Sequence, residues 1–300
     1  MRTITKLLLG MAMPVALLAA QGASSATLIT QWNYENMAAF TAFTSSNPGA
    51  GFDVAGSDPN NAVYTLAPPV APANPLAGAS TRLFWGQPID ANPSSLVVTD
   101  KVGLGTVGIG TGLPGQVGPG KVNTNGADEL DLRITHNNFV IALGQSLRTA
   151  TLTGALLLQP ALPVLGSAFG PLVANFNIVF NETNNSGPCL VGVPSCPDIF
   201  VLDRANSDQL TNIPLVVIDG YAYTLNVVVN LTPLPAAACA DAGVAAGCDG
   251  FVTEENQSTT LPVFFNIKAR LVTEVPEPGI LALLGLGLAG VGFGQIRRRK

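Results

Sequence analysis

The sequence predicts an all-β protein folded as an antiparallel β-sandwich. Three observations support this fold class. Hydrophobic residues alternate with polar residues over many short segments, as expected for strands that bury one face. The 32 Gly and 23 Pro residues provide turns between these segments. Helical periodicity is confined to Glu35–Phe43. Many half-exposed strands with almost no helix are typical of two sheets packed face to face.

The clearest alternation occurs in three segments. In Tyr221–Leu231, Val263–Leu271 and Ala174–Phe180, every second residue is hydrophobic, and the intervening positions carry mostly Asn, Thr, Lys or Arg. One polar face per strand indicates antiparallel, half-exposed sheet. Further strands are predicted at Leu28–Tyr34, Thr81–Trp85, Ser95–Thr99, Leu130–His136, Leu147–Leu158, Ile199–Leu202 and Ile213–Ile218.

The N-terminus has the three parts of a secretory signal peptide. Basic residues stand at Arg2 and Lys6, an apolar run follows over Leu7–Ala20, and small residues stand at Ser24 and Ala26. We therefore predict a signal peptide over residues 1–26, which signal peptidase removes.

The C-terminus predicts a membrane segment followed by a basic tail. An uncharged run extends from Gly279 to Ile296, and a helix of that length reaches about 27 Å, enough to span a hydrocarbon core. The extended stretch before it contains Pro276, Glu277 and Pro278. Four cations close the chain, namely Arg297, Arg298, Arg299 and Lys300. Such a tail stays on the cytoplasmic side of the inner membrane.

Residues 27–274 remain as the exported domain, predicted to be a single β-sandwich, with a division near residue 120 as the alternative. Outside the two terminal signals the chain has 18 acidic and 8 basic residues, a net charge of about −10. This charge argues against nucleic acid as a partner. The Pro-rich stretch Ala67–Ala79 and the Gly-rich stretch Gly103–Gly120 are predicted to be surface loops.

The four cysteines predict disulfides. Cys189 and Cys196 stand seven positions apart, and Cys239 and Cys248 stand nine apart. Four cysteines allow three pairings, and proximity in the sequence favours 189–196 and 239–248. A zinc site is disfavoured because these spacings exceed those of zinc knuckles and an oxidising compartment consumes thiols.

His136 is the single histidine, which excludes sites that need two. It shares a strand face with Leu132 and Ile134, so we expect a core or turn-bracing side chain that bonds a backbone carbonyl or the Asn138 amide. The sequence contains no Gly-x-Ser-x-Gly nucleophile motif. No catalytic residue is predicted.

One loop has the oxygen donors of a weak calcium site. Asp128, Glu129 and Asp131 lie close together beside asparagines, and such ligands suit Ca²⁺. The spacing does not match an EF-hand, and a turn with solvated carboxylates is the preferred interpretation. No cofactor or metal is otherwise predicted.

The C-terminal segment resembles the PEP-CTERM sorting signal of Gram-negative bacteria. In that signal a Pro-Glu-Pro motif, one transmembrane helix and a basic end follow one another, as they do in residues 275–300. The resemblance implies recognition by an exosortase, a membrane-embedded enzyme similar to a cysteine transpeptidase, near Pro276–Pro278. It also implies export to the surface of bacteria that make extracellular polysaccharide.

A second resemblance involves Thr135, His136 and Asn138. These residues look like the Thr-His-x-Asn signature of the THxN group of PEP-CTERM proteins. Other stretches similar to that group are Leu83–Gly86 with Ser95–Val97, Phe180–Thr183, and the two cysteine loops with Cys196–Val201. The resemblance names a group without implying an activity.

Three classes of function are compatible with these observations. The first, which we prefer, is a non-catalytic structural or adhesive component of the extracellular matrix. The second is a carbohydrate-binding module that stacks sugars on exposed Trp32, Trp85 or tyrosine rings, although aromatic residues make up only 6% of the chain. The third is a hydrolase, which no recognisable spacing of paired carboxylates supports.

Overall fold

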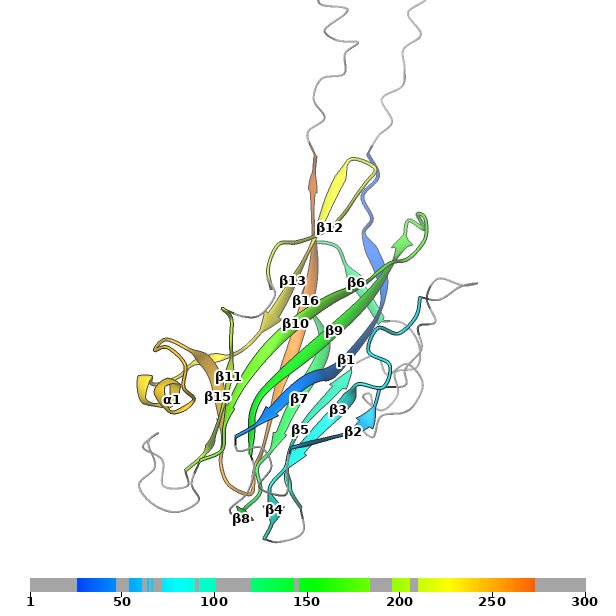
Figure 1. The fold of residues 1–300 in the computed structure, drawn as a ribbon. Coiled ribbons are helices and arrows are strands. Elements are labelled where there is room, and N and C mark those ends of the chain that lie inside the picture. Colours follow the sequence, from blue (N-terminus) through cyan, green and yellow to red (C-terminus); the bar gives the residue numbers. More distant parts are fainter. Residues whose placement is uncertain are drawn as a thin grey trace, which may run out of the picture.

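The computed structural model describes residues 26–46, 54–60, 64, 66, 72–89, 92–100, 120–142, 146–183, 196–205 and 210–272. This part of the chain is nearly all β-structure with one short helix (Figure 1). The elements are β1 (Gln31–Ser45), β2 (Ala55–Pro59), β3 (Ser80–Trp85), β4 (Gln87–Pro88), β5 (Ser94–Asp100), β6 (Gly120–Asn123), β7 (Glu129–Asn137), β8 (Ile141–Ala142), β9 (Leu147–Leu162), β10 (Phe169–Asn181), β11 (Asp198–Leu202), β12 (Ile213–Ile218), β13 (Tyr221–Val229), β14 (Thr232–Pro233), α1 (Ala236–Asp241), β15 (Asp249–Thr253) and β16 (Ser258–Leu271).

Fourteen of the strands form one sheet that curls over its own core. Its order is β12-β13-β16-β7-β5-β3-β1-β9-β10-β11-β15-β14, with β2 beside β3 and β6 beside β1, while β4 and β8 form a separate pair. The predicted antiparallel all-β class is confirmed. The two separate sheets of a sandwich are replaced by one curled sheet, because long strands such as β1, β9 and β10 twist along their length and carry the sheet around the core.

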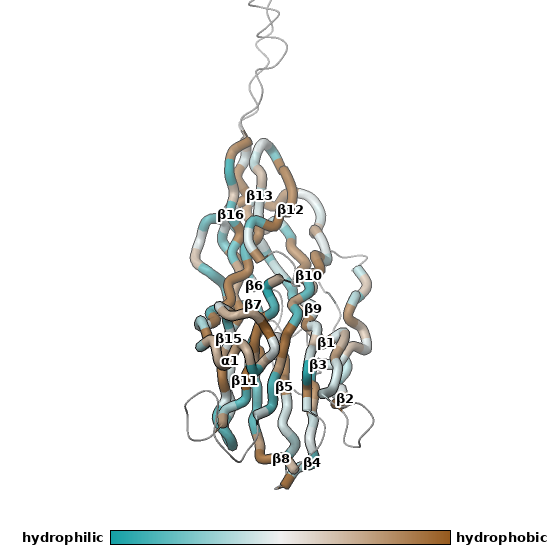
Figure 2. Tube along the Cα trace, turned by 60° about the vertical axis from the view of Figure 1, so that its left-hand side comes forward, coloured by the Kyte–Doolittle hydropathy of each residue, from teal (hydrophilic) through white to brown (hydrophobic). Residues whose placement is uncertain are grey.

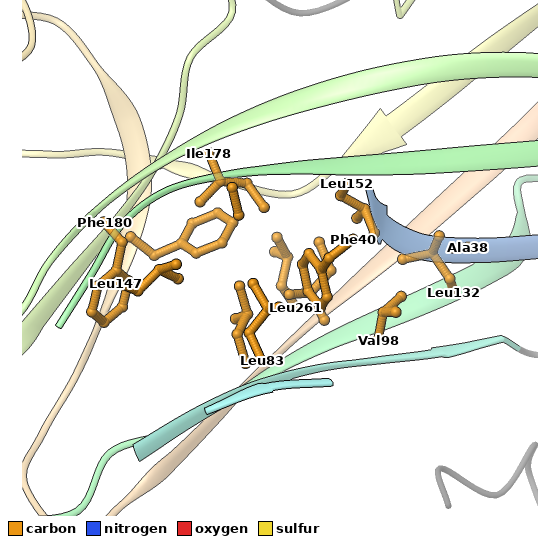
Figure 3. Close-up of a cluster of buried hydrophobic side chains, with 14 of the residues drawn as sticks. Ala38, Phe40, Leu83, Val98, Leu132, Leu147, Leu152, Ile178, Phe180 and Leu261 are labelled. Carbon is orange, nitrogen blue, oxygen red and sulfur yellow. The ribbon is translucent and has the colours of Figure 1, made fainter. Parts of the chain in front are cut away.

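The main core lies inside this curl. Figure 3 shows side chains from β1, β3, β5, β7, β9, β10 and β16 pointing into one shared interior, including Phe40, Leu83, Leu152 and Phe180. Burial alternates along β7 and along parts of β10 and β16, and Figure 2 shows hydrophobic and hydrophilic residues mixed along the strands. A second cluster around Trp32, Tyr34 and Tyr223 continues the core along β1, β13 and β16. Alternation therefore sets which face of each strand is buried.

The helical prediction for Glu35–Phe43 is wrong, because these residues continue β1 and pair with β9. Residues 34–40 are buried on both faces. Their outer face is covered by Tyr64, Leu66 and Leu76 from the segment between β2 and β3. A strand covered on both sides loses its polar alternation, which is the pattern that separates strand from helix.

The helix α1 was not predicted. It is only six residues long, and it packs Ala238 and Ala242 on Ile199 and Val201 of β11. In the described residues no helix has the length and apolarity to cross a membrane. The predicted signal peptide, apart from Ala26, and the predicted transmembrane helix lie outside these residues.

The two ends of the curled sheet are distinct. β1 begins and β16 ends at the upper end in Figure 1, while β4 and β8 lie at the lower end. Near the upper end, the Thr27 N–H donates to Asp219 Oδ2 over 2.6 Å, and the Val272 N–H donates to the Gly220 carbonyl over 2.8 Å. The described chain therefore starts and finishes at one end of the sheet.

Candidate functional site

The lower end of the sheet gathers polar side chains from five strand ends. Trp85 ends β3, and His136 stands one residue before the end of β7. Glu182 follows β10, Asp198 begins β11, and Glu255 lies in the turn between β15 and β16. Register brings them together, because Leu96 of β5 and Thr259 of β16 pair with His136 from either side, and Asp198 pairs with Thr253. We call Glu182, Asp198 and Glu255 the acidic cluster.

Trp85 joins the acidic cluster to the aromatic core. Its indole Nε1–H donates to Glu182 Oε2 over 2.6 Å. Its ring stacks on the His136 imidazole, with centroids 5.8 Å apart and planes 9° apart. Phe180 packs edge-on against both rings, at 5.0 Å and 4.9 Å. The turn after Trp85 needs a glycine, because Gly86 has a φ of +78° and a Cβ there would lie 2.5 Å from Ile141.

Asp198 is held in place by Thr183, which follows β10. Its Oδ1 accepts a hydrogen bond from the Thr183 N–H over 2.9 Å. The Thr183 hydroxyl donates to the carbonyl of Cys196. Cys196 is disulfide-bonded, and its predicted partner Cys189 lies outside the described residues. The other predicted disulfide, Cys239–Cys248, is confirmed.

The residues of the Thr-His-x-Asn signature face two ways. His136 and Asn138 are fully buried at the lower end. Asn138 Nδ2 donates to the Thr253 carbonyl over 2.9 Å, and its backbone N–H donates to the Gln257 carbonyl. Thr135 lies on the outer face, where its hydroxyl pairs with that of Thr260 at 3.0 Å. The signature therefore contributes two of its three named side chains to the surroundings of the acidic cluster.

Several polar atoms here have no hydrogen-bond partner among the described residues. They include both ring nitrogens of His136, Asn138 Oδ1, Glu182 Oε1, Asp198 Oδ2 and both carboxyl oxygens of Glu255. His136 Nε2 lies 3.6 Å from Asp198 Oδ2, which is too long for a hydrogen bond. Buried polar groups are normally satisfied, so this concentration of unpaired atoms marks the lower end as a candidate site.

Burial changes the acid–base behaviour of these groups. Desolvation raises the pKa of Glu182 to about 7, although the Trp85 hydrogen bond opposes the shift. Burial and the neighbouring Glu182 carboxylate raise the pKa of Asp198 well above its ordinary value. Burial also raises the pKa of Glu255, against the effect of the Asn138 amide. Desolvation lowers the pKa of His136 to about 3, so the imidazole is neutral at neutral pH.

The three carboxyl groups form a set that can hold a metal ion. Each offers one oxygen, and these oxygens lie within 4.8 Å of one another. Sequence reasoning missed this set, because its members come from separate strand ends. Glu182 and Asp198 do fall in two stretches similar to the THxN group, Phe180–Thr183 and Cys196–Val201. That similarity was the available signal.

The residues of the weak calcium hypothesis lie elsewhere. Asp128 Oδ1 accepts a hydrogen bond from Asn266 Nδ2 over 2.6 Å. Asp131 Oδ1 accepts one from Asn36 Nδ2 over 2.7 Å, and burial raises the pKa of Asp131 to about 7. Glu129 begins β7. Two of the three carboxylates thus bind side-chain amides, and a calcium site in this loop stays a prediction.

The residues expected to offer sugar-stacking rings are mostly buried. Trp32 and Trp85 are 0% and 1% exposed. Three of the four tyrosines are buried as well, and Tyr221 is half-buried. The rings pack in the core because each indole Nε1–H has an internal acceptor, Thr124 Oγ1 for Trp32 and Glu182 for Trp85. The carbohydrate-binding alternative therefore lacks the exposed tryptophan rings on which it depended.

Comparison with known proteins identifies the C-terminal segment. Residues 274–299 match the model of the PEP-CTERM protein-sorting motif. The match includes Pro276, Glu277 and Pro278 and most of the basic tail, so the predicted PEP-CTERM sorting motif is confirmed, while its transmembrane helix stays a prediction. No curated protein matches the chain, and the THxN resemblance stays a prediction. The chain therefore carries the sorting motif of exosortase-targeted secreted proteins, which are anchored in the membrane and then cleaved.

Proposed function

We propose that the exported β domain is a non-catalytic structural or adhesive component of the extracellular matrix. The observation that carries this proposal is the sorting motif at residues 274–299, which directs the chain to the exosortase route. The described chain starts and finishes at the upper end of the sheet. The domain therefore joins its sorting segment at that end and presents its sides and lower end to other molecules.

An uncharged polar array on the outer face supports the adhesive role. Thr151 and Thr153 of β9 donate to Asn177 and Asn175 of β10, each over 2.8 Å. Two threonine pairs link β9 to β1, namely Thr41 with Thr153 at 2.7 Å and Thr44 with Thr149 at 2.6 Å. We call these seven residues the Thr/Asn array. Regularly spaced hydroxyl and amide groups without charge suit hydrogen bonding to a neutral polysaccharide, which the acidic body does not repel.

The chemistry of the lower end also supports a non-catalytic role. Its carboxyl groups have raised pKa values, as in glycoside hydrolases. However, Asp198 and His136 are fully buried. A pocket in the described residues lies in the main core, where apolar side chains such as Leu152, Ile178 and Leu261 line it. A carboxyl pair that acts on a polysaccharide needs access to the scissile bond.

The first experiment tests sorting. The full-length chain is produced in a host with its exosortase and in the same host without it, and the protein is located by fractionation and intact mass. We expect a shortened form outside the cell only when the enzyme is present. An unchanged mass and location without the enzyme would overturn the assignment.

The second experiment tests adhesion. We expect the exported protein to sediment with purified exopolysaccharide, and T149V/T151V, which removes two hydroxyls of the array from half-buried side chains, to reduce the bound fraction severalfold. T135V/T260V removes a hydroxyl pair from the outer face of β7 and β16 and serves as the matched control. Equal binding by both double variants would remove the array from the proposal. Release of sugar fragments by the wild type but not by D198N would show catalysis instead.

A further inference from the structure

We propose that the acidic cluster at the lower end binds one calcium ion through Glu182, Asp198 and Glu255. The three carboxyl groups place one oxygen each within 4.8 Å of the others. Three oxygens that lie at most 4.8 Å apart have a common centre at most about 2.8 Å from each, and calcium–oxygen bonds are about 2.3–2.6 Å long. A single ion at that centre therefore lies at or close to bonding distance from all three carboxyl groups.

A second observation points to a ligand independently of the carboxyl groups. Asn138 and His136 are each 0% exposed. Asn138 Oδ1 and both His136 ring nitrogens have no partner among the described residues, and His136 Nε2 lies 3.6 Å from the equally unpaired Asp198 Oδ2. An unpaired buried polar atom costs about 1–3 kcal/mol. A bound cation provides a partner for the acceptor atoms Asp198 Oδ2 and Asn138 Oδ1.

Charge balance favours a cation at this place. Within the described residues, no Lys or Arg side chain forms an ion pair with Glu182, Asp198 or Glu255. Several largely buried carboxylates repel one another unless a positive charge lies between them. A divalent ion neutralises most of the charge of the cluster.

The donor set selects calcium among the common cations. All three members of the cluster offer carboxyl oxygens, which are ligands for hard ions. Magnesium prefers to keep several water molecules and an octahedral geometry, whereas calcium accepts six to eight irregular ligands. Calcium ions in extracellular modules bind with dissociation constants of about 10⁻⁴–10⁻³ M. The ion would tie together the segment after β10, the start of β11 and the β15–β16 turn.

The test uses the exported protein after treatment with EDTA and dialysis. Calcium chloride is titrated by calorimetry, and thermal unfolding is followed with and without calcium. We expect one ion per chain, a midpoint temperature that rises with calcium, and no comparable rise with magnesium. The fluorescence of Trp85, which contacts Glu182, should change over the same concentration range.

Variants assign the binding to these residues. E255Q removes one charge from a half-buried side chain, and D198N keeps an acceptor for the Thr183 N–H. Each should weaken calcium binding roughly tenfold or more. D128N changes an exposed carboxylate in the other acidic segment and should leave the titration unchanged.

Three outcomes would overturn the proposal. The first is a wild-type protein whose stability and heat signal do not respond to calcium. The second is a response that persists in E255Q and D198N but is lost in D128N, which would place the ion at Asp128. The third is tighter binding of zinc than of calcium that is lost in H136Q, since that would assign a nitrogen-ligated transition metal.

Discussion

The upper and lower ends of the curled sheet both bury a tryptophan, but the polar groups around the two rings differ. At the upper end the Trp32 Nε1–H donates to the Thr124 hydroxyl over 3.0 Å, and the Tyr223 hydroxyl accepts from the Ile29 N–H over 2.8 Å. At the lower end Trp85 donates to the carboxylate of Glu182. There the carboxylate is one of three, and atoms of all three have no partner in the described chain.

This difference separates structural burial from a candidate site. Even a buried carboxyl group can be satisfied in this fold, since Glu35 of β1 is 0% exposed and its Oε2 accepts the Leu66 N–H over 2.9 Å. The lower end does not provide such partners for Glu182 Oε1, Asp198 Oδ2 and Glu255. Buried polar groups without partners are rare, and they are typical of functional sites.

Truncation of the two tryptophans should give the largest effect and test the comparison directly. W32A removes a fully buried ring that packs on Phe169 and Tyr223, and we expect it to lower the free energy of unfolding by about 3–5 kcal/mol. W85A should cost less, because the space it opens lets water reach Glu182. Urea unfolding followed by circular dichroism measures both. A larger loss in W85A would contradict the idea that the lower end lacks polar partners.

Stability should fall as the pH rises from about 5 to 7 in the absence of divalent ions. The pKa of Glu182 is raised from 4.5 to about 7 and that of Asp131 from 3.8 to about 7, and the pKa values of Asp198 and Glu255 are raised as well. The folded state therefore binds these protons more tightly than the unfolded state, and the stabilisation disappears as the pH passes through the folded pKa. Each group contributes up to about 1.4 kcal/mol per pH unit.

His136 works in the opposite direction. Its pKa is lowered to about 3, so between pH 3 and about 6.5 the folded state binds fewer protons, and stability rises with pH. Below pH 6.5 the loss of stability with rising pH that the several carboxyl groups cause is larger than the gain that one imidazole causes. Above pH 6.5 only the carboxyl groups still change the stability with pH. Urea unfolding in EDTA at pH 5, 6 and 7 measures the net change of the free energy of unfolding with pH. E182Q is the control, because it should make this change smaller. A stability that rises throughout this range would contradict the raised pKa values of the buried carboxyl groups.

Conservative replacement of the same tryptophans should give a smaller and more specific difference. W85F and W32F both leave a ring in place and both remove an indole donor. W32F leaves a neutral hydroxyl without its donor, whereas W85F leaves a carboxylate, and hydrogen bonds to charged groups contribute about 1 kcal/mol more. We expect W85F to be the more destabilising by that amount at pH 8 in EDTA. Equal losses of stability in W85F and W32F would show that the two indole hydrogen bonds contribute equally and that the charge of Glu182 adds nothing.

The strands of this fold were largely predictable from the sequence. Tyr221–Leu231 coincides closely with β13, and Ala174–Phe180 lies inside the longer β10, because one face of each segment is polar. The helix predicted over Glu35–Phe43 was wrong because residues distant in the sequence, such as Tyr64 and Leu66, cover the second face of β1. The curl of a single sheet was not predictable either, since alternation fixes which face is buried and does not fix the strand order.

The candidate site was predictable only in part. The parity of His136 with Leu132 and Ile134 placed its ring on the buried face, where the structure has it. The expected hydrogen bond to a backbone carbonyl or to Asn138 is absent, because neither ring nitrogen has a hydrogen-bond partner and Nε2 lies 3.6 Å from Asp198 Oδ2. Asp198 is 62 positions away in the sequence. Only the pairing of β11 with β15 and of β7 with β16 brings such residues together.

Substitution of Thr135 should have the smallest effect on stability. It tests whether every residue of the Thr-His-x-Asn signature contributes to the acidic cluster. T135V keeps the shape of the side chain and removes one hydroxyl of an exposed cross-strand pair with Thr260. Such pairs contribute about 0.2–1 kcal/mol, so we expect a loss of stability within that range. The calcium response should be unchanged, whereas N138A should weaken it, because Asn138 adjoins Glu255. Calorimetric titration of both variants measures this, and a weakened response in T135V would mean that the outer face of β7 also shapes the lower end.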